Sequence, residues 1–120
     1  MKLSRLAAWL LLAVLLALLV FGTQMPGAWK DETLRVAHLP WWLTKVAHFG
    51  LFAGMAGLAS AAPLRWRVPA VLGAALALGL TTEGLQFWAS NRTPTWHDVG
   101  IDMAGALLGL GLGLARWKLR

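Results

Sequence analysis

The chain has 120 residues, of which 58% are hydrophobic and 13% are charged, and its formal net charge is +6. Soluble domains contain about 45–50% apolar and about 25% charged residues, and a chain this short buries only about two-thirds of its surface on folding. This composition excludes an ordinary soluble domain and predicts a single membrane domain over residues 1–120. The chain has no Cys, which excludes disulfides and Cys-ligated zinc. The basic residues lie at the ends of apolar segments, as in membrane proteins, so we expect no nucleic-acid partner.

Four apolar segments predict an all-α membrane bundle of four transmembrane helices, at about residues 6–23, 46–62, 68–88 and 99–115. At about 1.5 Å per residue, 17 residues span about 26 Å, which is just enough for the hydrocarbon layer. The first segment follows Lys2 and Arg5, as a signal peptide would. However, its apolar run is longer than a usual signal core, and no convincing Ala-x-Ala site follows. We therefore expect a retained helix, with a cleaved signal peptide as the alternative.

The connections between the segments predict the orientation of the bundle. The long connection 24–44 contains two prolines and favours a short interfacial helix around Asp31–His38. With four crossings, both termini share a side with the short turn 63–67. That side carries most of the basic residues: Lys2, Arg5, Arg65, Arg67, Arg116, Lys118 and Arg120. The positive-inside rule then places both termini in the cytoplasm.

Seven polar side chains lie inside or beside the last three apolar segments, where hydrocarbon makes them costly. They are Lys45, His48, Glu83, Gln86, Arg92, Asp98 and Asp102. A charge in the bilayer centre costs about 2.5–3.5 kcal/mol on insertion scales, so we expect these groups to meet each other or to act on a ligand. Residues three or four apart share a helix face, and the topology puts these faces at the outer ends of their helices. The sequence therefore predicts one polar site, open toward the outer leaflet.

A stripe of small residues continues along the last predicted helix, below its two acids. Gly105, Gly109 and Gly113 recur every four positions. Such spacing lets another backbone come close. The simplest interpretation is packing within the bundle, and the alternative is an interface between two copies of the chain.

These polar and glycine positions resemble the VanZ-like family of small bacterial membrane proteins over about residues 44–113. The resemblance rests on Lys45-Val46-Ala47-His48-Phe49, on Thr82-Glu83-Gly84-Leu85-Gln86, and on Asn91-Arg92 through Asp98 to Gly105-Ala106-Leu107-Leu108-Gly109. Two departures stand out, because Thr44 replaces the usual Asp and Asp102 replaces the usual Asn. The resemblance implies a multi-pass protein of the bacterial inner (plasma) membrane. It also suggests a link to the cell envelope and to antibiotic resistance, since the family is named after a member linked to glycopeptide resistance.

Each polar group has a structural interpretation beside the functional one. Glu83 is either an ion-paired acid that fixes helix register or a proton carrier or general base. His48 is either a satisfied core histidine or an acid/base group. Arg92 either pairs with Glu83 or Asp98 or receives an anionic headgroup. Lys45 either extends to the interface or helps to bind the anion.

The working hypothesis is a site that binds a polar or anionic group of a membrane lipid or a lipid-linked envelope molecule. Arg92, Lys45 and Gln86 are the binding candidates, and Glu83 and His48 are the acid/base candidates if there is a reaction. Asp98 and Asp102 would orient the cations or a water molecule. Whether the protein is an enzyme is left open by the sequence.

Three alternatives accompany this hypothesis. His48, His97, Asp98 and Asp102 have the ligand types of a zinc or iron(II) site, but no HExxH spacing is present. We therefore expect no metal and no other cofactor. A small proton- or ion-coupled transporter is a second possibility, with Glu83 as the carrier and a homodimer as the active form. The third is a structural membrane subunit without a site.

Overall fold

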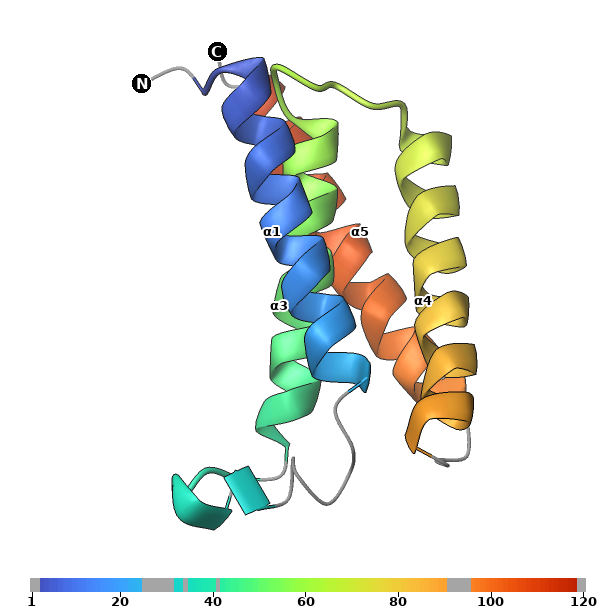
Figure 1. Ribbon diagram of the computed structural model, residues 1–120. Coiled ribbons are helices and arrows are strands. Elements are labelled where there is room, and N and C mark those ends of the chain that lie inside the picture. Colours follow the sequence, from blue (N-terminus) through green and yellow to red (C-terminus); the bar gives the residue numbers. More distant parts are fainter. Residues whose placement is uncertain (1–2, 25–31, 34, 41, 91–95, 119–120) are drawn as a thin grey trace.

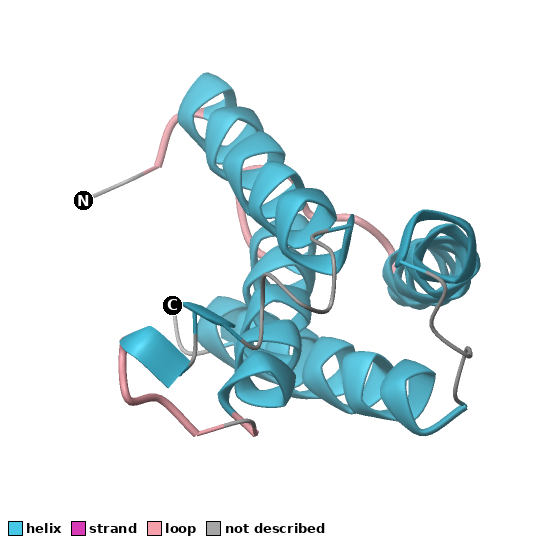
Figure 2. Ribbon diagram, turned by 60° about the horizontal axis from the view of Figure 1, so that its bottom comes forward, coloured by secondary structure: helices cyan, strands magenta, loops and turns pink. Residues whose placement is uncertain are grey.

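The computed structural model describes residues 3–24, 32–33, 35–40, 42–90 and 96–118, and its long elements are all helices. They are α1 (Arg5–Gln24), α3 (Leu43–Ser60), α4 (Val68–Ser90) and α5 (Trp96–Lys118). No strand occurs in the described residues, as the colouring of Figure 2 shows. The prediction of an all-α fold with four long helices is confirmed.

The helices extend further into polar sequence than the apolar segments that predicted them. Helix α3 begins at Leu43 rather than at residue 46, and α5 begins at Trp96 rather than at residue 99. An apolar segment shows only which residues must be kept away from water. The helix itself continues into polar residues until a capping residue or a proline ends it. In the first connection, the described residues 32–33 and 35–36 are helical, in the region where we expected a short helix. Arg35 pairs there with Glu32 at 2.6 Å.

The four helices alternate in direction, and both chain ends lie at the same end of the bundle (Figure 1). Helices α3 and α5 therefore run parallel to each other, and they form the most extensive helix contact. Helices α1 and α4 pack against this pair from other sides. The opposite end of the bundle holds the start of α3, the end of α4 and the start of α5, and we call it the loop end.

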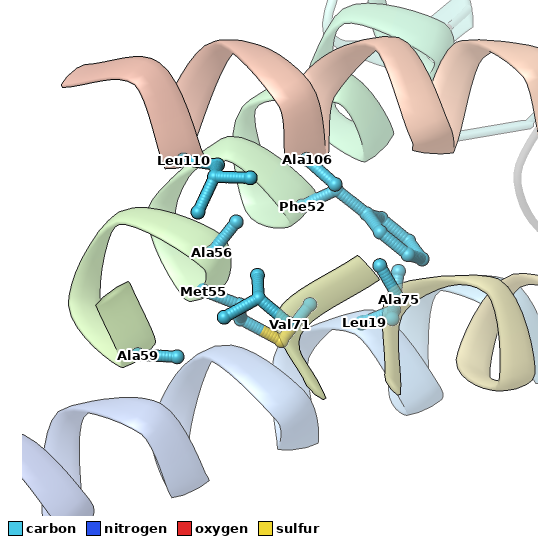
Figure 3. Close-up of a cluster of buried hydrophobic side chains, with 9 residues drawn as sticks. All are labelled: Leu19, Phe52, Met55, Ala56, Ala59, Val71, Ala75, Ala106 and Leu110. Carbon is cyan, nitrogen blue, oxygen red and sulfur yellow. The ribbon is translucent and has the colours of Figure 1, made fainter. Parts of the chain in front are cut away.

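The hydrophobic core lies in the middle of the bundle and receives side chains from all four helices (Figure 3). Its buried members are Leu19, Phe52, Met55, Ala56, Ala59, Val71, Ala75, Ala106 and Leu110. Many large apolar side chains point outward instead, with Leu6 and Phe21 both 70% exposed. An exposed apolar surface of this extent fits contact with lipid rather than with water.

Three helices are long and apolar enough to cross a membrane, among the described residues. The stretches are Arg5–Gly22 in α1, Val68–Leu85 in α4 and His97–Ala115 in α5. Helix α3 is not among them, and it carries two of the predicted polar residues. It nevertheless lies beside α5 along its length, from Lys45 near Asp98 to Ser60 near Gly113. We therefore still expect α3 to cross with α5, shielded by its neighbours.

The glycine stripe of α5 lies directly against the backbone of α3. A Cβ atom at Gly105 would collide with the carbonyl of Phe49, and one at Gly109 would collide with the carbonyl of Ala53. At Gly113 it would collide with the hydroxyl of Ser60. The stripe therefore serves packing within the chain, as its simplest interpretation predicted. It is not available as the interface between two copies, because α3 already occupies it.

Candidate functional site

The predicted polar residues that the structure describes belong to the ends of α3, α4 and α5 that lie at the loop end (Figure 1). Lys45 and Asp98 are each the third residue of their helix, in α3 and α5. His48 and Asp102 lie about one turn further into the same two helices. Because α3 and α5 run parallel, one turn along either helix moves to the same depth in the bundle. The expectation that these faces converge is met by α3 and α5.

The outer of the two contacts is an ion pair between Lys45 and Asp98. Lys45 Nζ donates to Asp98 Oδ1 at 2.9 Å, and the side chains are 37% and 24% exposed. A half-exposed pair is screened by its surroundings and contributes little to stability, about 0–1 kcal/mol. An ammonium group has three N–H donors, and within the described part of the chain Asp98 accepts one of them. Asp98 has a further interaction within the structure, so a partner from outside would meet the partly exposed ammonium group of Lys45.

The inner contact is between His48 and Asp102. His48 Nδ1 lies 3.4 Å from Asp102 Oδ1, and the side chains are 20% and 1% exposed. When Nδ1 carries the hydrogen, the imidazole donates to the carboxyl oxygen. The distance is several tenths of an ångström longer than the usual N–H···O contact. Asp102 is thus almost completely buried, but the hydrogen bond that joins it to His48 of α3 is a long one.

The second carboxyl oxygen of Asp102 has no hydrogen-bond partner among the described residues. It points toward Gly79 of α4, where an added Cβ would come within 3.5 Å of Oδ2. A buried polar atom without a partner costs about 1–3 kcal/mol, and such atoms in native proteins usually have a functional explanation or an ordered water. Asp102 is therefore the residue of this cluster for which a purely structural role is the least satisfactory explanation.

Glu83 is buried at the same end, on α4. Its residue is 6% exposed, and it has an interaction within the structure. Gly79 and Glu83 are one turn apart and share a helix face. Helix α4 runs antiparallel to α5, so the step from Gly79 to Glu83 leads from the level of Asp102 toward that of Asp98. The register therefore places Glu83 near the outer ion pair in depth.

Two predicted binding residues lie outside what can be described at this site. Arg92 is outside the described residues, and of Gln86 only the backbone position, within α4, is described. His97 is exposed at the start of α5. Among the described residues, no group of three His, Asp or Glu side chains lies close enough to hold a metal ion.

The geometry gives the site a graded depth. Lys45 is the most exposed group of the site and His48 is 20% exposed, whereas Asp102 and Glu83 are buried. A ligand at the outer pair would meet a cation and a carboxyl group fixed side by side. A proton moving inward would meet His48 and then Asp102. The arrangement therefore suits binding of a headgroup at the surface, with titratable groups directly beneath it.

Two contributors to this arrangement were not predicted from the sequence. Gly79 of α4 faces the carboxyl group of Asp102, and Thr82 is 3% exposed and donates to the carbonyl of Gly79 at 3.0 Å. The four-residue spacing of Gly79 and Glu83 was the available signal. The small residues Ala53 and Gly57 of α3 were also missed, although their spacing matches that of the α5 glycines.

Comparison with known proteins adds a family assignment to this geometry. A family model described as VanZ/LLP1 matches residues 7–117, which is nearly the whole chain. The match includes the Lys45–Asp98 ion pair, the His48–Asp102 contact, Glu83 and the glycine stripe. Searches of curated proteins and of solved structures each returned no match.

Proposed function

This chain belongs to the VanZ/LLP1 family of membrane proteins, and we propose that it binds a lipid or lipid-linked molecule of the cell envelope at its loop end. The observation that carries the proposal is the outer ion pair, in which Lys45 and Asp98 are held together while remaining partly exposed. A partly exposed ion pair at the end of a membrane helix lies where it can contact a lipid headgroup.

The lengths of the helices support this placement. Helix α5 has 23 residues, which correspond to about 35 Å at 1.5 Å per residue, whereas the hydrocarbon core is about 30 Å thick. When α5 is centred in the bilayer, its third residue lies at the boundary between the hydrocarbon core and the headgroups. Asp98 occupies that position, its contact with Lys45 holds the ammonium group there, and an anionic headgroup oxygen would accept from Lys45 Nζ beside Asp98.

Lipid retention measured by native mass spectrometry tests the binding role. With a polyprenyl phosphate as the probe, we expect Lys45→Gln to retain it about tenfold more weakly, because a charge-assisted hydrogen bond is lost. Arg35→Gln is the matched control, since Arg35 is exposed and lies in the connection at the same end. Arg92→Ala in the same assay tests whether that residue helps to hold the anion. Retention that is unchanged by Lys45→Gln contradicts the proposal.

We also propose that the protein spans the bacterial inner membrane several times, with both termini in the cytoplasm and the site facing outward. The excess of basic residues at the terminal end supports this orientation. The chain has no natural cysteine, so single cysteines can be introduced for labelling. We expect His38→Cys to react with an impermeant reagent from outside, and Arg65→Cys to react only after the cells are opened. The reverse pattern would turn the site toward the cytoplasm.

The buried acids favour a second candidate function, a proton-coupled transporter. Glu83 and Asp102 are 6% and 1% exposed, and acids within membrane segments mark proton pathways in many proteins. Dimerisation would need a face other than the glycine stripe. Proteoliposome flux separates the two functions, because proton-coupled uptake should be lost in Glu83→Gln. Uptake that survives this substitution excludes Glu83 as the carrier.

A role in glycopeptide-antibiotic tolerance would follow if the bound molecule belongs to cell-wall assembly. The family assignment supports this extension. A bacterial strain that depends on this chain should lose tolerance when the chain carries Lys45→Gln, at equal protein level in the membrane. Equal inhibitory concentrations for the two forms would remove the link between the site and tolerance.

A further inference from the structure

The terminal end of the bundle has a surface feature that the proposed function does not use. Arg5 and Trp9 are one turn apart on α1, and the Trp9 ring packs against the ring of Trp66 in the turn between α3 and α4. The two ring centroids are 5.9 Å apart, at a tilted angle. Trp66 is flanked in sequence by two arginines. We call these five residues, Arg5, Trp9, Arg65, Trp66 and Arg67, the arginine–tryptophan rim.

The turn that carries three of the five residues of this rim is fixed in place. Trp66 N donates to the carbonyl of Ala59 at 2.7 Å, and Arg65 N donates to that of Ala61 at 2.9 Å. Leu64 is buried, and Trp66 packs against the core. The three arginines are exposed, and Trp9 is 46% exposed. The rim therefore presents its cations from a rigid base rather than from a loose tail.

The charges of the rim have no acidic side chain near them in the sequence. All five Asp and Glu residues of the chain belong to the loop end or to the connection there: Asp31, Glu32, Glu83, Asp98 and Asp102. Moreover, Arg5 is the first residue of α1, and Arg67 directly precedes α4. Neither helix has an acid in its first turn. Helix N-termini carry partial positive charge and favour anions, and among the described residues no acid forms an ion pair with Arg5 or Arg67.

We propose that the arginine–tryptophan rim binds the phosphate of an anionic phospholipid in the leaflet at the terminal end. The exposed guanidinium groups of the rim bind the phosphate, and the two indole rings lie at the boundary between headgroups and acyl chains, which is the depth that Trp favours. This site is separate from the polar contacts at the loop end and does not depend on the function proposed for them. Its ligand is an abundant glycerophospholipid such as phosphatidylglycerol, recognised by charge.

Lipid titration of the full chain tests the proposal, with phosphatidylglycerol and the zwitterionic phosphatidylcholine as probes in native mass spectrometry. We expect Arg5→Gln and Arg67→Gln each to weaken phosphatidylglycerol binding about fivefold, and the double variant about thirtyfold. Phosphatidylcholine binding should not change. Arg35→Gln, an exposed arginine at the other end, is the control. Lys45→Gln should remove a different bound lipid, so that the triple variant loses both.

Several outcomes would overturn the assignment. Equal losses in Arg35→Gln and Arg67→Gln would mean that binding follows net charge alone. Displacement of the lipid by millimolar inorganic phosphate would make the rim a phosphate site rather than a lipid site. Undiminished binding in the double variant would exclude the rim, and unfolding temperatures equal to that of the parent would show that the variants are folded.

Discussion

The contact between α3 and α5 has two halves that hold the same helices together in opposite ways. At the loop end, long polar side chains reach across the gap, as in the ion pair of Lys45 with Asp98. Toward the terminal end, the two backbones approach each other closely, and Gly109 meets the backbone of Ala53 directly. Opposite charges hold the helices together in the first half, and close packing of complementary surfaces holds them together in the second. The charged half is partly exposed, whereas the glycine half is buried.

The close packing of the glycine half sets the register of α3 against α5, and this register decides which charged side chains face each other. Gly105 lies opposite Phe49 and Gly109 opposite Ala53, which is a constant offset of 56 positions (105 − 49 and 109 − 53). One further step of four toward the loop end places Lys45 opposite position 101, between Asp98 and Asp102. When the parallel helices pack at this offset, Lys45 therefore lies next to Asp98 and Asp102. Weak ion pairs alone would not fix such a register.

The largest expected effect comes from Gly109→Ala. The added methyl group meets the backbone of Ala53, which cannot rotate away, so α3 and α5 must separate along their length. Overpacking of this kind costs about 1–3 kcal/mol, and sometimes more. We expect a lower free energy of unfolding in detergent and also weaker lipid retention, although position 109 is far from the headgroup site.

Gly111→Ala is the matched control for this substitution. It lies two residues away in the same helix, and an added Cβ there meets nothing within 4 Å. Alanine is a better helix former than glycine by about 1 kcal/mol, so stability should hold or rise. If the two variants unfold alike, close packing of the stripe does not determine the register.

A smaller effect on stability, but a large one on function, is expected from Asp102→Asn. The amide has nearly the same volume as the carboxyl group, whose Oδ2 has no hydrogen-bond partner within the described chain. Little stabilising contact is lost, so the free energy of unfolding should change by less than about 1 kcal/mol. If the carboxyl group is held for function, polyprenyl phosphate retention or proton-coupled uptake should fall.

The unfolding and binding measurements on this variant have to be read together. A loss of stability of several kcal/mol would show that Asp102 is a structural residue with a strong partner. An amide variant with unchanged stability, retention and uptake would instead leave the buried acid without a role. His48→Gln serves as the companion variant, because it removes the group that contacts Oδ1.

Much of this architecture follows from the sequence because the membrane restricts the choices. Apolar segments of about 17–21 residues admit little except helices, and a four-residue glycine repeat indicates close packing. The alternation of directions then puts the polar ends of three segments at one end. Lys45, His48, Asp98 and Asp102 could be grouped by that argument alone.

The sequence alone could not predict which of these polar residues pair with each other. Asp98 and Asp102 are one turn apart, and either could accept from Lys45 until the register of α3 against α5 is known. That register depends on which small residues of α3 meet the stripe, and α3 offers Gly50, Ala53, Gly54 and Gly57 in several phases. The orphaned Oδ2 of Asp102 depends in turn on Gly79 of a third helix. Such details arise from packing between helices and leave no periodic signal in one segment.

The smallest expected effect is the coupling energy between Lys45 and Asp98, which tests how accessible this ion pair is to solvent. In a double-mutant cycle of Lys45→Gln and Asp98→Asn, we expect a coupling of about 0.5–1 kcal/mol, since both side chains are partly exposed. The coupling should decrease between low and high salt, because ions screen accessible pairs. Unfolding in detergent at two salt concentrations measures it. A coupling well above 2 kcal/mol that salt leaves unchanged would describe a sealed pair. Such a pair could not exchange its partner for a headgroup, and the charged half would then be a structural lock like the glycine half.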